Sequence, residues 1–167
     1  MPDVKTKSRV SEIWELLETV HDPEVPVLTV VDLGVVREVR EIESGIEVVI
    51  TPTYSGCPAM NVIEINIKMA LATAGYPNVA VRTVLSPAWT TDWMSEAGKQ
   101  KLKAYGIAPP RGAAVDKSLL FAEPKRVPCP RCDSFDTKMV SEFGSTACKA
   151  HYQCNSCLEP FDYFKCL

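Results

Sequence analysis

Residues 46–75 read IEVVITPTYSGCPAMNVIEINIKMALATAG, and they predict a strand, a loop and a helix in that order. In the first six residues, Ile46, Val48 and Ile50 alternate with Glu47, Val49 and Thr51, which is the period of a β-strand. Pro58 suits the first residue of a helix, and Gly75 suits the position just after its end. The helix is apolar around much of its circumference, so we expect it to pack on a sheet.

The flanking sequence extends this unit on both sides. Residues 78–85 predict a second strand, which a right-handed crossover would place parallel to the first. Residues 35–42 predict a strand joined to residue 46 by a turn, and residues 8–20 predict an amphipathic helix. A third helix is expected over residues 91–105, ending at Gly106. The fold class is therefore α/β, as a small two-layer α/β domain with a mixed sheet.

Six of the seven cysteines lie in the last 39 residues. Cys129 and Cys132 form one CxxC pair, and Cys154 and Cys157 form another, with 21 residues between the pairs. Four thiolates in this arrangement suit a tetrahedral Zn²⁺ and predict a C-terminal zinc-ribbon module, although the same ligands also suit rubredoxin-like iron or an iron–sulfur cluster. Three further residues of this segment could form a second metal site or could be ordinary packing and surface residues. They are Cys148, His151 and Cys166.

The domain boundary is expected near residue 124. Pro109, Pro110 and Gly112 interrupt the pattern before it, and no periodicity follows until the first cysteine pair. We therefore predict an α/β domain over residues 1–124 and a four-cysteine zinc ribbon over residues 125–167.

Composition excludes several classes of function. The chain has 18 basic and 21 acidic residues, a net charge of −3, which gives no case for binding nucleic acid or an anionic membrane. No apolar run approaches the roughly 18 residues of a membrane-spanning helix, and the amino terminus lacks the apolar core of a signal peptide. A soluble, cytoplasmic protein is expected.

The seventh cysteine stands apart from the others. Cys57 lies between Gly56 and Pro58, at the predicted start of the helix. The free N–H groups and the positive dipole end there favour a thiolate, which would make Cys57 a metal ligand or a nucleophile. The alternative is a small buried residue at a tight corner. His21 is the sole histidine of the main domain and could approach this loop, or it could be partly exposed after the first helix.

Several motifs resemble known families. The sequences HDPE at residues 21–24, VDLG at residues 31–34, Thr51 and GCP at residues 56–58 are similar to the α/β domain of iron–sulfur assembly and carrier factors. The remaining motifs resemble the PaaD family, accessory proteins of bacterial phenylacetate degradation that are sometimes labelled subunits of phenylacetyl-CoA oxygenase. These motifs are PAWTTDW at residues 87–93, GIAPP at residues 106–110, FGSTACKA at residues 143–150 and the two CxxC pairs.

The resemblance implies a maturation role in phenylacetate catabolism rather than catalysis. Such a factor would assemble or deliver an iron–sulfur cluster to the multicomponent phenylacetyl-CoA epoxidase, with its iron–sulfur reductase as the main partner. Carried over to this sequence, Cys57 is the candidate ligand of the transient cluster or iron, with Asp22, Glu24 and Thr51 as motif residues. The four ribbon cysteines would hold structural zinc.

One thiolate cannot hold a cluster alone, because clusters usually take four protein ligands. Cys57 would therefore need a partner, which could be a second copy of the chain in a homodimer, a small thiol or the client protein. Two other functions remain open at this point. The chain could be an integral structural or electron-transfer subunit of the oxygenase, or a thiol enzyme that uses Cys57.

Overall fold

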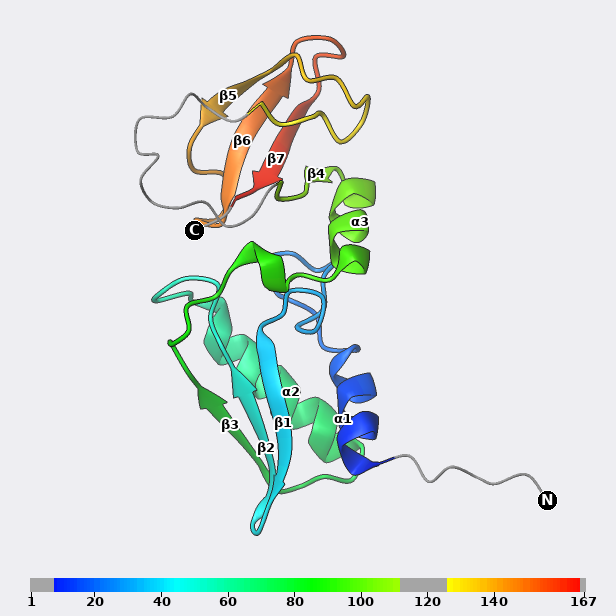
Figure 1. Cartoon of the computed structure of the whole chain (residues 1–167), viewed down its shortest axis with the longest axis vertical. Coiled ribbons are helices and arrows are strands. Elements are labelled where there is room, and N and C mark those ends of the chain that lie inside the picture. Colours follow the sequence, from blue (N-terminus) through cyan, green and yellow to red (C-terminus); the bar gives the residue numbers. More distant parts are fainter. Residues whose placement is uncertain (1–7, 112–125, 166–167) are drawn as a thin grey trace, which may run out of the picture. The chain divides into compact units, whose positions relative to one another are not determined.

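The computed structural model describes residues 8–111 and 126–165. The chain forms two compact units that divide between Ala88 and Trp89, and each is described by itself (Figure 1).

The first unit is an α/β sandwich built from five elements. They are α1 (Arg9–Leu17), β1 (Val36–Ile42), β2 (Gly45–Ile50), α2 (Ala59–Thr73) and β3 (Val79–Thr83). The strand order is β1-β2-β3, with β1 antiparallel and β3 parallel to β2. The mixed sheet and the parallel crossover through α2 are thus confirmed.

Local sequence signals account for the ends of both helices. The Ser8 hydroxyl accepts a hydrogen bond from the backbone N–H of Ser11 and caps α1. Gly75, with a φ of +96°, follows Ala74 at the end of α2, which is the conformation that glycine adopts without steric cost. The predicted helix ends are therefore confirmed to within three residues, since α1 stops at Leu17 rather than near residue 20.

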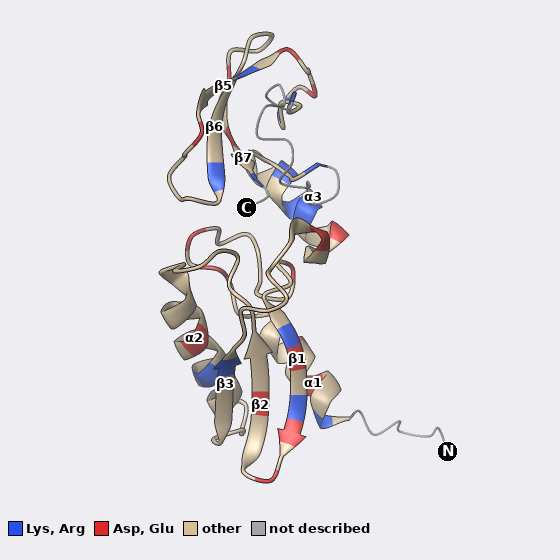
Figure 2. Cartoon of the chain, turned by 60° about the vertical axis from the view of Figure 1, so that its left-hand side comes forward, with Lys and Arg blue, Asp and Glu red and all other residues tan. Residues whose placement is uncertain are grey.

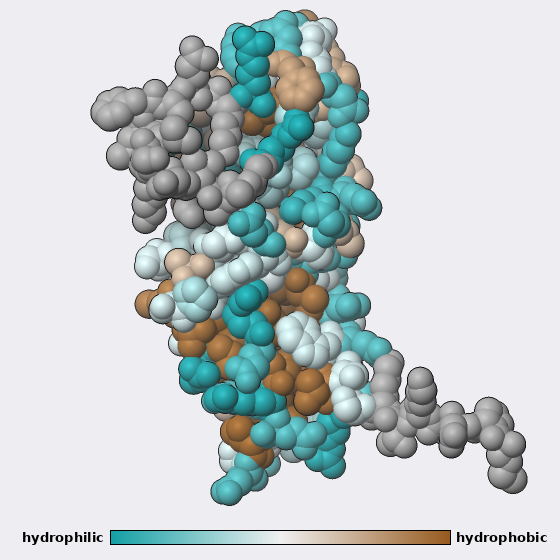
Figure 3. All heavy atoms as spheres, in the orientation of Figure 1, coloured by the Kyte–Doolittle hydropathy of each residue, from teal (hydrophilic) through white to brown (hydrophobic). Residues whose placement is uncertain are grey.

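The core of this unit lies between the helices and one face of the sheet. Val48 and Ile50 on β2 are fully buried, as are Ile67 and Leu71 on α2. The opposite face of the sheet carries an ion-pair network in which Glu47 contacts Arg40 and Arg82. Hydrophobic residues also reach the surface of this unit among hydrophilic ones, as the face in Figure 3 shows.

The second unit contains a four-stranded sheet with the order β4-β7-β6-β5. Its strands are β4 (Ile107–Ala108), β5 (Thr137–Ser141), β6 (Lys149–Cys154) and β7 (Pro160–Phe164). The hairpin of β5 and β6 joins the two CxxC pairs, as expected for a zinc ribbon.

Two expectations differ from the structure in this unit. The single helix expected over residues 91–105 is divided into a 3-10 turn, η1 (Thr91–Trp93), and α3 (Glu96–Tyr105). Met94 is extended between them, and the Ser95 hydroxyl caps α3 by accepting a hydrogen bond from the Gly98 N–H.

The compact units also divide at a different place from the boundary expected between residues 124 and 125. Ile107 and Ala108 pair with Asp162 and Tyr163 of β7, so α3 and β4 pack with the cysteine-bearing sheet. Residues 112–125, which lead up to the expected boundary, lie outside the described residues. None of the described helices is long and apolar enough to cross a membrane.

Candidate functional site

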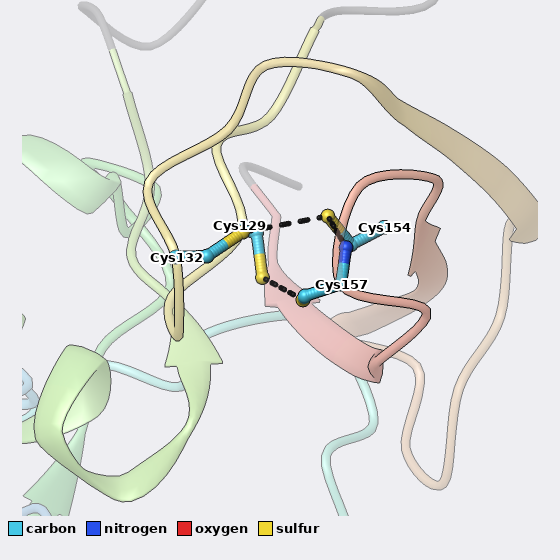
Figure 4. A group of neighbouring side chains, drawn as sticks. All are labelled: Cys129, Cys132, Cys154 and Cys157. Carbon is cyan, nitrogen blue, oxygen red and sulfur yellow. Dashed lines mark hydrogen bonds between the residues drawn. The ribbon is translucent and has the colours of Figure 1, made fainter.

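Four cysteines converge at one end of the ribbon sheet (Figure 4). Cys129 and Cys132 come from the loop before β5, and Cys154 and Cys157 come from the end of β6 and the turn that follows it. Their four sulfur atoms all lie within 4.8 Å of one another. Cys129 and Cys154 are buried, whereas Cys132 and Cys157 are exposed. Among the described residues, this is the group of cysteine, histidine and carboxylate side chains arranged to hold a metal ion.

The same backbone turn presents each pair of thiols. The Cys129 N–H donates to the carbonyl of Ser134 at 2.9 Å, and the Cys154 N–H donates to the carbonyl of Glu159 at 2.9 Å. Each bond spans five residues and closes a loop around the two sulfurs. The residue after the second cysteine has a positive φ in both turns, 59° at Asp133 and 62° at Leu158. Sequence reasoning missed these two positions, although the place directly after each CxxC pair could have indicated them.

The sulfur positions fit one tetrahedral ion. The Sγ atoms of Cys129 and Cys157 are 3.6 Å apart, and those of Cys132 and Cys154 are also 3.6 Å apart. With Zn–S bonds of about 2.3 Å, a tetrahedral site has sulfurs about 3.8 Å apart. An iron–sulfur cluster spreads its ligands over several irons, which would separate the sulfurs further. The donor set and its spacing therefore fit a single thiolate-bound ion rather than a cluster.

Hydrogen bonds and burial shift the pKa values of Cys132 and Cys154 in opposite directions. The backbone N–H of Cys157, which lies 3.5 Å from the Cys154 sulfur, lowers the pKa of Cys154 to about 7 together with that of Ser156. The Ser134 N–H stabilises the Cys132 thiolate, but desolvation and hydrogen bonds from the other three thiols outweigh it and raise the pKa of Cys132 to about 12. Metal binding displaces these protons, so the affinity depends on pH.

Contacts outside the sulfurs hold the two turns together. The Asn155 side-chain amide donates to the Asp136 carboxylate at 2.8 Å, and its backbone N–H donates to the Asp136 carbonyl at 2.8 Å. The Ser134 and Ser156 hydroxyls are hydrogen-bonded at 2.7 Å. Behind the site, Tyr152 stacks on Phe161 and meets Tyr163 edge to face. These three aromatic residues are buried in one hydrophobic cluster with Cys129 and Cys154.

The remaining C-terminal candidates do not join this group. Cys148 is buried, and its thiol lies 3.0 Å from the Thr146 hydroxyl. The Nδ1 atom of His151 lies 3.2 Å from the Asp162 carboxylate on the facing strand. Cys166 lies outside the described residues.

Cys57 lies in the loop between β2 and α2. Its N–H donates to the Tyr54 carbonyl at 3.2 Å, which closes a four-residue turn. Gly56 occupies the third position of that turn with a φ of +79°, a conformation that favours glycine. Pro58 follows and precedes the first residue of α2, so the expected placement of Cys57 at the helix start is confirmed. The thiol is half-buried and free.

Asp22 and Glu24 lie in the loop that joins α1 to β1. Asp22 is buried, and its carboxylate accepts hydrogen bonds from the N–H groups of Glu24 at 2.8 Å and Val25 at 2.7 Å. This carboxylate therefore stabilises the backbone conformation of the loop in which it lies. Glu24 is half-buried, and His21 is exposed. In the described parts of the chain, no cluster of three such potential ligands includes Cys57.

Thr51 follows β2 at the start of the Cys57 loop. Its N–H donates to the Val35 carbonyl at 2.9 Å, and the Val35 N–H donates to the Val30 carbonyl, which ties this loop to the one that carries Asp22. Thr51 is 1% exposed, and its hydroxyl is the buried side-chain polar atom without a hydrogen-bond partner among the described residues. Buried hydroxyls normally have a partner, because an unmade bond costs about 1–3 kcal/mol.

Two family models match separate parts of the chain. Residues 11–85 match a family model described as an iron–sulfur cluster assembly protein. Residues 113–165 match a PaaD zinc β-ribbon domain. A crystal structure of the DUF59 domain of unknown function from Bacillus anthracis is 30% identical, with a TM-score of 0.52, and the match covers 56% of this chain and 90% of that one.

Two relatives match this chain over very different shares of its length. A protein of Porphyromonas gingivalis (strain W83) named as an Fe-S protein maturation auxiliary factor is 34% identical over 54% of this chain and 88% of its own length. A protein of Escherichia coli (strain K12) named as a subunit of 1,2-phenylacetyl-CoA epoxidase is 52% identical over 95% of this chain and 94% of its own length. With similarity this high across nearly the whole of both chains, and with its ribbon matched by the corresponding family model, the protein belongs to the PaaD family.

Proposed function

We propose that this protein is a non-catalytic assembly factor that carries an iron–sulfur cluster or its iron on Cys57 and passes it to a component of phenylacetyl-CoA epoxidase. The observation that carries the proposal is the single half-buried thiol of the first unit, held by a glycine turn at the start of α2. The similarity to Fe-S maturation factors over this unit, and to an epoxidase subunit over the whole chain, supports it.

Cys57 supplies one thiolate, which suits delivery better than permanent storage. A cluster held by several protein thiolates would be a resident redox centre, whereas a cluster with one ligand here needs others from the client or a small thiol. Transfer then exchanges one iron–sulfur bond for another. A client thiol loses its proton and binds the iron, the bond to Cys57 breaks, and the released Cys57 thiolate takes up the proton. No electron is transferred.

The buried Thr51 hydroxyl belongs to the same proposed site. This hydroxyl has no acceptor in the described parts of the chain, so it can donate to a sulfide or thiolate of the bound cargo, and this would satisfy it. Asp22 and Glu24 take part differently. The Asp22 carboxylate fixes the backbone of the loop that carries Glu24, and that loop is tied to the Cys57 loop through Thr51 and Val35.

The four ribbon cysteines hold a structural zinc ion in this proposal. When bound, the ion supplies folding free energy to a unit whose core cluster is small, and it contributes no step to cargo transfer. We propose the iron–sulfur reductase of the epoxidase as the client, because a maturation factor has a cluster-bearing protein as its target.

Anaerobic reconstitution with iron and sulfide tests the proposal. The wild-type protein should retain iron, whereas Cys57→Ser should retain none and should still contain one zinc per chain. Cys148→Ser is the matched control, because Cys148 is buried outside the metal group. Equal iron in wild type and Cys57→Ser would contradict the proposal.

An integral subunit is the second candidate function, favoured by the name of the Escherichia coli relative. Purification of the active epoxidase distinguishes an integral subunit from an assembly factor. An integral subunit stays with the complex at fixed stoichiometry, whereas an assembly factor is absent from the matured enzyme. A thiol enzyme would instead turn over a substrate through Cys57.

A further inference from the structure

Helix α2 has two apolar faces, and within the described residues one of them is covered. The inner face packs on the sheet through Ile63, Ile67 and Leu71, which are at most 1% exposed. The outer face is open to solvent, with Val62, Ile65 and Met69 exposed by 44%, 56% and 63%. The sequence predicted that the helix packs on a sheet without indicating which face would be covered, and no part of the proposed chemistry accounts for the open face.

The outer apolar residues are spaced like the seam of a helix pair. Pro58, Val62, Ile65, Met69 and Ala72 are all exposed and follow one another at intervals of four, three, four and three residues. This alternation is the heptad spacing by which two α-helices interlock their side chains. A strand or an irregular loop as partner would not require it. We name these five residues the outer seam.

Charge does not select the partner of this seam. Glu64 and Lys68 form an ion pair with each other at 2.6 Å, one turn apart. Figure 2 shows the rest of α2 as uncharged. The surface therefore offers apolar contact without unpaired charge, and its natural complement is an apolar helix face.

The area of the seam favours a transient partner over a permanent dimer. Three large side chains, each about half exposed, offer on the order of 300 Å², whereas a stable interface buries about 800 Å² per partner. Contacts this small occur in complexes that must separate again, which a delivery step requires.

The outer seam also begins beside the proposed cargo site. Pro58 directly follows Cys57, and Val62 is five residues beyond Cys57, a rise of about 7.5 Å along a helix. A helix seated on the seam would bring its end within reach of the thiol that must exchange its cargo.

We propose that the outer seam of α2 is the docking surface for an apolar helix of the client, which binds transiently so that client thiols reach Cys57. This inference rests on the function proposed above. It names the surface and the secondary structure by which the client is recognised, neither of which follows from the transfer chemistry.

Charged substitutions on the seam test it. Ile65→Asp and Met69→Asp place a carboxylate on exposed positions, so the fold and the loading of Cys57 with cluster should not change. Transfer from the loaded protein to the cluster-free reductase subunit should slow by at least about tenfold at limiting concentration. Val140→Asp on β5 is the matched control, because Val140 is 57% exposed and as apolar as Ile65. It should transfer at the wild-type rate.

The outcomes separate this inference from the proposed function. If both seam variants load and transfer as wild type does, the docking surface is wrong and the carrier function stands. If the wild-type protein does not load cluster through Cys57, the carrier function is wrong. Sedimentation of the same variants adds a third result, because a wild-type dimer that the seam variants dissociate would identify a second copy as the occupant and overturn the proposal.

Discussion

Replacing Leu158 by glycine should strengthen metal binding, although it removes a hydrophobic side chain. Leu158 follows the second cysteine pair with a φ of 62°, and it is 70% exposed. The left-handed conformation costs an L-residue about 1–2 kcal/mol because of its β-carbon. Glycine removes that cost but loses about 0.5–1 kcal/mol more conformational entropy on folding. Little burial is lost, so the net gain is about 0.5–1 kcal/mol.

The gain should appear in the affinity for metal. Because folding of a small metal-bearing unit is coupled to metal binding, strain in the folded turn is subtracted from the binding free energy. A gain of about 0.5–1 kcal/mol corresponds to a roughly two- to fivefold lower Kd. Competition for Zn²⁺ between the reduced protein and a chromophoric chelator at fixed pH measures it.

Asp133→Gly is the matched control. Asp133 has nearly the same φ, 59°, in the corresponding position of the first turn. Aspartate tolerates the left-handed region better than leucine, and the Asp133 carboxylate also pairs with Lys103. Asp133→Gly should therefore leave the Kd for zinc unchanged. Strain at Leu158 does not limit metal affinity if Leu158→Gly binds zinc no better than wild type at full stoichiometry, or if Asp133→Gly gains more.

Three further changes follow from the structure. Zinc affinity should fall steeply as pH drops through about 7, because Cys154 regains its proton there and the cysteine ligands must give up their protons to bind the ion. A Kd that stays constant between about pH 5.5 and 8 would contradict this. Thr51→Val should raise the free energy of unfolding by about 1 kcal/mol, because a methyl group replaces a buried hydroxyl that has no hydrogen-bond partner among the described residues. Denaturant melts should show the opposite for Thr29→Val, whose hydroxyl accepts a hydrogen bond from the Asp32 N–H. Gly45→Ala should cost at least about 2 kcal/mol in the same melts, since its β-carbon would lie 2.2 Å from the Asn78 carbonyl oxygen; Gly56→Ala, where no atom lies within 4 Å, should cost less.

The sequence predicted those parts of the fold that local signals specify. Alternation in residues 46–51 and the glycine at residue 75 each act within a few residues, and the corresponding strand and helix ends were found close to where they were expected. The helix over residues 91–105 was only partly right, because Ser95 caps a new helix inside an otherwise continuous pattern.

The metal site was predictable for the same reason. Two cysteines three residues apart share one turn, so CxxC pairs specify their own geometry, and the four sulfurs do converge. The role of Asp22 was not predictable in detail. Only the folded loop shows that its carboxylate accepts hydrogen bonds from the N–H groups of Glu24 and Val25.

Periodicity and spacing along the chain were enough to predict the order of elements, the mixed α/β class and the four thiol ligands. Three other features emerge only in the folded chain. Pairing of Ile107 with Asp162 assigns α3 and β4 to the metal-bearing unit, burial leaves the Thr51 hydroxyl without a partner among the described residues, and the packing of α2 by one face leaves its outer seam exposed. All three depend on which distant segments meet, and an apolar helix does not reveal from its own sequence which of its faces will be covered.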